Sequence, residues 1–195
     1  LLSRRQRQMC IRDRAQQEKL HPYNGVGCFN DMDMLIVGMH GKGNVGLAGC
    51  SDVQYQTHYA LWALLGSPLM IGCDIREMSD ETRRILMNDE MIRINQDPLC
   101  RQPYKVKNHA WNDKVLIYVK ALADGDLAIG MFNLSDEKSR AAMNLDEIGL
   151  PFSTGHTLEL TEVWTCENLC ANNASLVTEL EPFASKVYRA KVVKL

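Results

Sequence analysis

The sequence predicts an α/β segment followed by an all-β domain. Up to about residue 101, short apolar runs alternate with stretches of helical periodicity, and beyond residue 102 short runs of alternating apolar and polar residues are separated by turn residues. The chain has 195 residues, of which 46% are hydrophobic, and can therefore bury a core in one large domain or two small ones. We expect one domain over residues 15–101 and a second over residues 102–195.

Residues 1–14 are left out of the fold prediction. They hold five arginines against one acidic residue, and they have neither an apolar stretch nor a cleavage site, so they do not form a signal peptide. The string LLSRRQRQMCIRDR resembles translated sequencing-adaptor DNA joined to a reading frame, which would mean that Leu1 is not the natural start. A disordered basic arm is the alternative.

Two short apolar runs in the first domain predict buried parallel strands. They cover residues 31–37 and 68–73, and a glycine-rich loop at residues 38–49 follows the first run. With the helices that come after each run, the order is βαβα, which implies a parallel sheet. Two such units alone cannot bury both faces of a parallel sheet.

Helical periodicity appears in two places. The first helix is expected over residues 52–65, after the capping residue Ser51, and Gly66 ends it. Four of its side chains share one face at three- and four-residue spacing and predict a core contact: Tyr55, Tyr59, Trp62 and Leu65. The second helix begins at Ser79 and gives way at Asn88 to a shorter helical segment.

The second domain reads as short strands joined by turns. Asp124 and Gly125 stand between two apolar alternating runs, which is the signal of a β-hairpin over residues 115–132. The strands expected here cover residues 114–120, 127–133, 158–165 and 186–193. Strands at this spacing indicate an antiparallel β-sandwich of roughly 90 residues.

Composition narrows the function. A formal net charge of -2 provides no basic field for phosphates, and no run of about 18 apolar residues appears, so we expect neither a nucleic-acid nor a membrane partner. The seven cysteines show no CxxC pair and no histidine at metal-ligand spacing, so no metal site is expected. Mostly free thiols favour a cytoplasmic location; pairing of Cys166 with Cys170 is the alternative in an exported protein.

The densest polar cluster in an apolar context lies at the start of residues 31–37. In a regular strand Asp31 and Asp33 share one face, about 6.5 to 7 Å apart, and Asn30, Met32 and Met34 share the other. Two such carboxylates need solvent, a partner or a hydrogen bond. They either order neighbouring backbone amides or bind an arginine, or they bind a polyhydroxylated ligand.

Four blocks in this region carry a family resemblance. The segment GCFNDMDML at residues 27–35 resembles the NDPDML-type segment of glycoside hydrolase family twenty-seven, which contains the α-galactosidases and α-N-acetylgalactosaminidases. The blocks ALWA, SPLM and INQDPL follow at residues 60–63, 67–70 and 94–99, in the order that the family shows. The resemblance covers residues 16–195. Met32 replaces the usual proline, which puts fine specificity in doubt.

The resemblance implies the last two βα units of a (β/α)8 TIM barrel, followed by a C-terminal antiparallel β-sandwich domain. Residues 31–37 would be barrel strand seven and residues 68–73 strand eight. In the family motif, the residues matching Asp33 and Met34 reach the bound sugar, and we add the neighbouring Asp31 as a substrate-binding candidate. Because Asp33 and Met34 alternate along a strand, a bulge or turn is needed for both to touch one ligand.

The catalytic pair is not expected in this chain. Retaining hydrolysis needs a nucleophilic carboxylate and an acid/base carboxyl about 5 to 5.5 Å apart. In the family these belong to Lys-x-Asp and Arg-x-x-x-Asp motifs on earlier barrel strands, so they are expected upstream of this chain. The chain has no Lys-x-Asp, and the match from Arg76 to Asp80 follows strand eight and is assigned a structural role.

The sequence therefore predicts an inactive, poorly soluble piece of a retaining α-galactosidase. The parent would hydrolyse terminal α-D-galactosyl residues of oligosaccharides without a metal or organic cofactor. Whether it prefers galactose, N-acetylgalactosamine or β-L-arabinopyranose stays open, as does assembly into a homo-oligomer. The rival hypothesis is a non-catalytic carbohydrate-binding or structural module made of the β domain.

Overall fold

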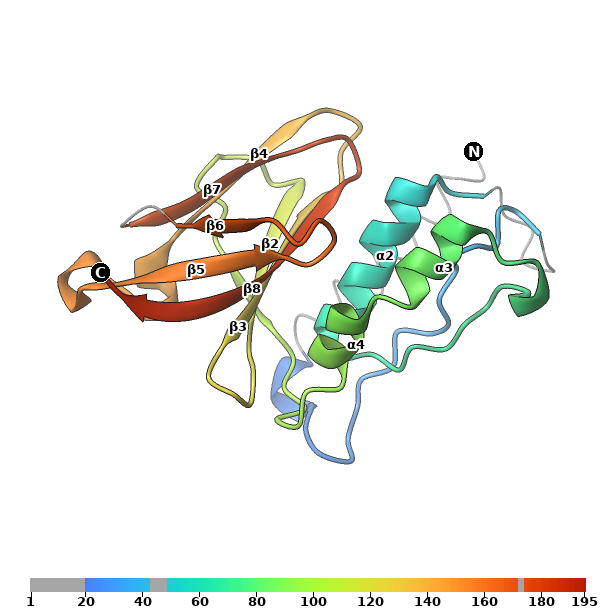
Figure 1. The fold of residues 1–195 in the computed structure, drawn as a ribbon, viewed down its shortest axis with the longest axis horizontal. Helices are drawn as coiled ribbons and strands as arrows, with labels where there is room; N and C mark the ends of the chain where they lie inside the picture. Colours follow the sequence, from blue (N-terminus) through green and yellow to red (C-terminus); the bar gives the residue numbers. More distant parts are fainter. Residues whose placement is uncertain (1–19, 43–48, 172–173) are drawn as a thin grey trace. The chain divides into compact units, whose positions relative to one another are not determined.

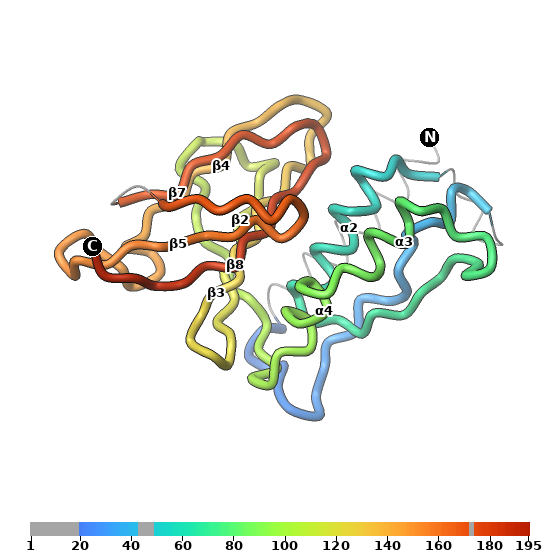
Figure 2. The backbone as a smooth tube through the Cα atoms, in the orientation of Figure 1, coloured from blue at the N-terminus to red at the C-terminus, as the bar shows by residue number. Residues whose placement is uncertain are grey.

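The computed structural model describes residues 20–42, 49–171 and 174–195. The excluded segment 1–14 and residues 43–48 of the predicted glycine-rich loop lie outside these ranges. The chain forms two compact units, residues 1–102 and residues 103–195 (Figures 1 and 2). The first unit holds the helices and the second holds every strand that is longer than an isolated bridge in the described residues.

The first unit is organised around the helix α2 (Asp52–Leu65). Ser51 accepts a hydrogen bond from the Gln54 amide, and the Gln54 side chain accepts one from the Ser51 amide, which completes a capping box. Gly66 ends the helix in the left-handed conformation. The predicted bounds are confirmed, but the helix is buried all round from Thr57 to Leu65 rather than along a single face.

Two shorter helices follow, α3 (Asp80–Leu86) and α4 (Asp89–Asn95). Ser79 caps the first, and Asn88, which was expected to end α3, accepts a hydrogen bond from the Met91 amide and so begins α4. Two 3-10 turns complete the unit, η1 (His21–Tyr23) and η2 (Ile75–Glu77).

The two predicted parallel strands are reduced to one parallel bridge between Leu35 and Ile71. The Leu35 amide donates to the Met70 carbonyl oxygen at 2.8 Å, and the prediction of full strands over residues 31–37 and 68–73 is wrong. Asp33 has φ 72°, which interrupts the extended backbone, and no ladder supports the pair in the described residues. A Cβ on Gly72 would lie 2.5 Å from the Leu35 carbonyl oxygen, so the bridge requires a glycine there.

The second unit is a two-sheet antiparallel assembly. Six strands form one sheet in the order β1-β2-β3-β8-β5-β6, and β4 pairs with β7 in the other. The strand bounds are β1 (Tyr104–Val106), β2 (Val115–Ala121), β3 (Leu127–Asn133), β4 (Ser139–Asn144), β5 (His156–Glu162), β6 (Asn168–Cys170), β7 (Ser175–Leu180) and β8 (Ser185–Lys194). The core contains Ile117, Ile129, Met143, Leu158 and Tyr188.

The predicted hairpin is confirmed. β2 and β3 pair from Val115 opposite Asn133 to Ala121 opposite Leu127, and Gly125 takes φ 91° in the connecting turn. Sequence patterning missed β1, β4, β6 and β7 because they are short or because their apolar residues are interrupted by polar ones. The 3-10 turns η3 (Leu145–Ile148) and η4 (Phe152–Thr154) lie between β4 and β5.

Candidate functional site

The residues predicted to bind substrate stand directly before the parallel bridge. Asp31, Asp33 and Met34 are exposed, and Met32 is buried at 2% relative exposure. Strict alternation would give Met32 and Met34 the same environment, but Met34 is 49% exposed. The positive φ of Asp33 interrupts the strand-like alternation of side chains at this point. Such an interruption is what Asp33 and Met34 would need in order to contact one ligand together.

Each of the two carboxylates orders a nearby backbone amide. Asp31 Oδ1 accepts from the Asp33 amide at 2.8 Å, and Asp33 Oδ1 accepts from the Met34 amide at 2.7 Å. This local role is one of the two that the sequence left open. A carboxylate has room for several donors on its two oxygens, so these bonds leave acceptor capacity for sugar hydroxyls at the exposed surface.

Helix α2 holds the backbone of the same segment. Trp62 Nε1 donates to the Asp33 carbonyl oxygen at 2.9 Å, and His58 Nε2 accepts from the Ile36 amide at 3.3 Å. The His58 and Trp62 rings are in contact in a tilted arrangement, with centroids 3.8 Å apart and an angle of 39° between the rings. Burial lowers the pKa of His58 from 6.5 to about 3, so the imidazole is neutral and accepts a hydrogen bond at physiological pH.

The residues after the bridge are engaged in a surface ion pair. Arg76 Nη2 lies 2.6 Å from Asp74 Oδ2, and the Arg76 guanidinium holds the pKa of Asp74 below its usual range. Asp74 also accepts from the Arg76 amide and thereby caps η2. Arg76 thus bonds to Asp74, and Asp80 lies in the first turn of α3, which fits the structural role assigned to this motif.

Metal ligands, membrane-spanning helices and disulfides can be checked in the part of the chain that is described. No group of three or more histidine, cysteine or acidic side chains is placed to hold a metal ion among the described residues. In the same ranges no helix is long and apolar enough to cross a membrane. None of the described cysteines, Cys166 and Cys170 included, forms a disulfide.

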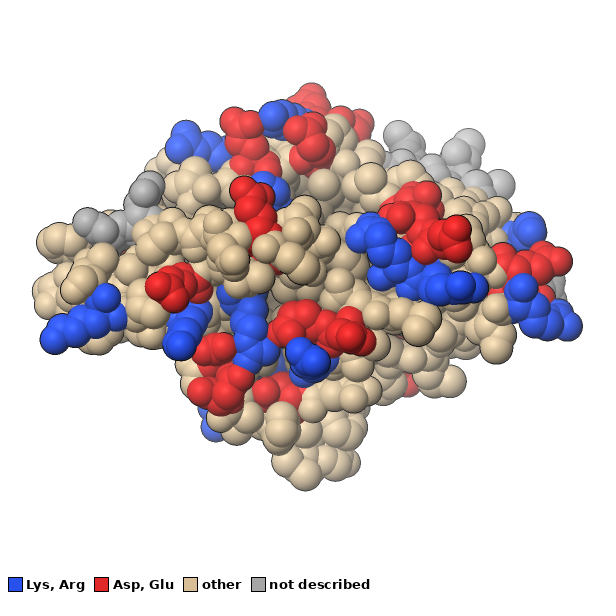
Figure 3. Space-filling view, in the orientation of Figure 1, with Lys and Arg blue, Asp and Glu red and all other residues tan. Residues whose placement is uncertain are grey.

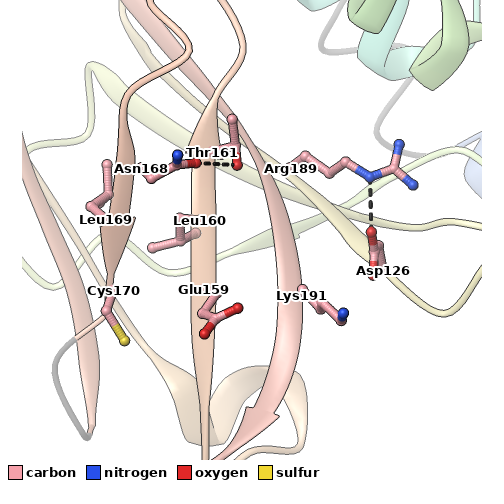
Figure 4. Close-up of a pocket in the computed structure, with 9 residues that line it drawn as sticks. All are labelled: Asp126, Glu159, Leu160, Thr161, Asn168, Leu169, Cys170, Arg189 and Lys191. Carbon is pink, nitrogen blue, oxygen red and sulfur yellow. Dashed lines mark hydrogen bonds and ion pairs between the residues drawn. The ribbon is translucent and has the colours of Figure 1, made fainter.

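The second unit has an open groove of about 520 Å³ on the β8-β5-β6 part of its larger sheet (Figure 4). Glu159 and Lys191 stand opposite each other on β5 and β8. Thr161 donates to Asn168 at 2.7 Å, and Arg189 donates to Asp126 at 2.8 Å. Sequence patterning did not identify this groove, because it depends on the pairing of β5 with both β6 and β8. Acidic and basic side chains are interspersed on the visible surface (Figure 3).

A βα segment with a parallel bridge and an antiparallel sandwich after it fit the class of glycoside hydrolases that have a barrel and a C-terminal β domain. Residues 8–97 match the family model described as Alpha galactosidase A, and residues 112–190 match Alpha galactosidase C-terminal beta sandwich domain. The chain belongs to this alpha-galactosidase family, glycoside hydrolase family twenty-seven.

Individual relatives agree. An alpha-galactosidase from Cyamopsis tetragonoloba is 31% identical over 85% of this chain and 37% of its own length. Alpha-galactosidase 3 of Arabidopsis thaliana is 32% identical over 78% of the chain and 32% of its own length. The crystal structure of alpha-galactosidase I from Mortierella vinacea superposes with a TM-score of 0.76 at 23% identity, over 89% of this chain and 42% of that protein. The chain thus spans about a third of the length of these curated relatives. The two family models and the structural similarity confirm the predicted fold class, a barrel fragment followed by a β-sandwich.

Proposed function

We propose that the whole protein containing this chain is a retaining α-galactosidase that removes terminal α-D-galactosyl residues from oligosaccharides. The turn at Asp33 carries the proposal, since its positive φ exposes the Asp33 and Met34 side chains together in the segment that matches the family motif. Exposed carboxylates that retain acceptor capacity suit the hydroxyls of a neutral sugar. The free cysteines fit a cytoplasmic location, which stays a prediction.

Activity measurements test this function. They also test whether the catalytic carboxyl groups lie outside the 195-residue chain. The 195-residue chain supplies sugar contacts but no nucleophile and acid/base pair, so it should give no turnover of a chromogenic α-galactoside, whereas the whole protein should be active. Turnover by the purified chain, abolished by Asp33→Ala, would show that the pair lies within it. A whole protein that is inactive on α-galactosides would refute the proposed function.

The role of Asp33 has its own measurement. In the whole protein, Asp33→Ala should lower kcat/KM by about 10- to 100-fold, because one charged hydrogen-bond acceptor to the sugar is lost. Arg76→Ala is the matched control, since it removes a charge that is engaged with Asp74 near the same edge. Equal losses in the two variants would contradict a specific role for Asp33.

The groove on the sandwich favours the second candidate, a non-catalytic carbohydrate-binding module. Its facing Glu159 and Lys191 supply an acceptor and donors for hydroxyl groups. Titration of the chain with galactose and with raffinose, followed by amide shifts on β5 and β8, tests this function. Shifts that disappear in Glu159→Ala would support a sugar site on the sandwich, and an absence of shifts at millimolar sugar would exclude it.

A further inference from the structure

Three polar side-chain groups on α2 form hydrogen bonds with the backbone of residues 33–40. Trp62 bonds to the Asp33 carbonyl, His58 to the Ile36 amide, and the Tyr55 hydroxyl accepts from the His40 amide at 2.8 Å. Positions 55, 58 and 62 lie on one face of a helix, and they meet the segment in reverse chain order. We call these three residues the α2 clamp.

The clamp differs from an ordinary apolar core face. Its members are buried, and a buried polar head is costly unless it is hydrogen-bonded, so each bond selects a particular backbone position. Tyr59 provides the contrast on the same helix. It is equally buried, but its hydroxyl donates to the Leu86 carbonyl oxygen in α3 at 3.1 Å.

Two of the clamp's hydrogen bonds lie at or near the left-handed turn at Asp33. Asp33 has a left-handed conformation, which costs free energy for a residue with a Cβ and is stabilised by hydrogen bonds from its surroundings. The Trp62 bond fixes the carbonyl of that residue, and the His58 bond fixes the chain three residues later. The two rings also contact each other, so the two hydrogen bonds come from neighbouring side chains on the same helix.

We propose that Trp62 and His58 are positioning residues for sugar recognition, which hold the Asp33 turn so that its carboxylate and Met34 face the substrate. The inference rests on the proposed function, because it assigns these two residues to the same sugar site. They act through Asp33 and do not themselves touch the sugar.

A double-mutant cycle in the whole protein tests the proposal. Trp62→Phe keeps an aromatic ring but removes the donor, and it should lower kcat/KM for a chromogenic α-galactoside about tenfold, mainly by raising KM. In an Asp33→Ala background the same substitution should cause little further loss. Tyr59→Phe, which removes the hydroxyl that bonds to Leu86, should lower the melting temperature and leave kcat/KM unchanged.

Two variants at His58 provide an independent arm if Trp62→Phe does not fold. His58→Gln retains a neutral acceptor and should keep most of the kcat/KM, whereas His58→Leu should lose about tenfold. The proposal is overturned if Trp62→Phe costs the same factor with and without Asp33, or if the two His58 variants are equally impaired.

Failure of the positioning role can be distinguished from failure of the proposed α-galactosidase function. If the wild-type whole protein does not hydrolyse α-galactosides, the function fails, and nuclear magnetic resonance of the whole protein decides whether the clamp positions Asp33. Trp62→Phe should then shift the Asp33 and Met34 amide signals, and Tyr59→Phe should leave them in place. Unchanged Asp33 and Met34 signals in Trp62→Phe would overturn the positioning role.

Discussion

Asp33 combines two demands at one residue, a strained backbone and an exposed carboxylate. Its amide donates to Asp31, its carbonyl accepts from Trp62, and its own carboxylate accepts from the Met34 amide. Aspartate tolerates the left-handed conformation better than most residues because its short side chain bonds locally. The same side chain that stabilises the turn is therefore the one available to a sugar.

His58 makes stability depend on pH. Its folded-state pKa of about 3 lies below the unfolded value near 6.5, so the unfolded chain takes up a proton first as the pH falls. The contribution to stability is complete above pH 6.5 and is lost toward pH 3, at about 1.4 kcal/mol per pH unit. Between pH 7.5 and 5 the wild type should lose about 2 kcal/mol more unfolding free energy than His58→Gln, measured by urea denaturation. Parallel pH profiles for the two proteins would contradict a neutral buried imidazole.

Residue types at the site could be predicted from the sequence, but their geometry could not. The pattern around Asp31 and Asp33 marked the polar cluster, and strand alternation then placed Met32 and Met34 on the same face. Alternation fails because a hydrogen bond from Trp62, 29 residues away, stabilises a turn at Asp33. Trp62 was predicted as a core residue, which its burial confirms, but its hydrogen-bond partner depends on tertiary contacts that periodicity does not encode.

At the scale of elements, local signals predicted helices and the hairpin well. The caps at Ser51 and Ser79 and the turn at Gly125 depend on neighbours within a few residues, so the sequence alone locates them. Parallel pairing depends on distant segments, and the predicted strands reduce to the bridge between Leu35 and Ile71. A parallel strand gains its hydrogen bonds from neighbours, and this pair lacks a further neighbour in the described ranges.

Gly72 sets how closely the two bridged segments approach. Gly72→Ala would place a Cβ 2.5 Å from the Leu35 carbonyl oxygen, so the backbone must move and the bridge should weaken. We expect a loss of about 1 to 3 kcal/mol in unfolding free energy, as for other overpacked positions. Gly25→Ala is the control, because a Cβ there meets nothing within 4 Å. Equal stability of Gly72→Ala and Gly25→Ala in urea denaturation would show that the bridge adapts without cost.

At the scale of the whole molecule, the bridge leaves apolar side chains in solvent. Met70 and Ile71 are 57% and 47% exposed, and we call them the bridge patch. Parallel sheets are normally covered on both faces, and exposed apolar patches on soluble proteins mark interaction surfaces or aggregation sites. The patch therefore gives a structural reason for the poor solubility expected of the chain.

A charged substitution in the bridge patch should have different effects in the 195-residue chain and in the whole protein. In the 195-residue chain, Met70→Lys should raise the monomer concentration that survives centrifugation several-fold, because a charge interrupts an exposed apolar surface. Val192→Lys is the matched control, at a position that is 37% exposed on β8 of the sandwich, and it should have little effect. Equal gains from the two variants would attribute solubility to net charge alone.

In the whole protein, where we propose that further barrel segments cover the patch, Met70→Lys should instead lower the melting temperature, because an ammonium group would be buried without a partner. A covered patch requires that Met70→Lys raise the solubility of the 195-residue chain and lower the melting temperature of the whole protein. If Met70→Lys improves solubility in the chain without lowering the melting temperature of the whole protein, the patch is exposed in the whole protein as well.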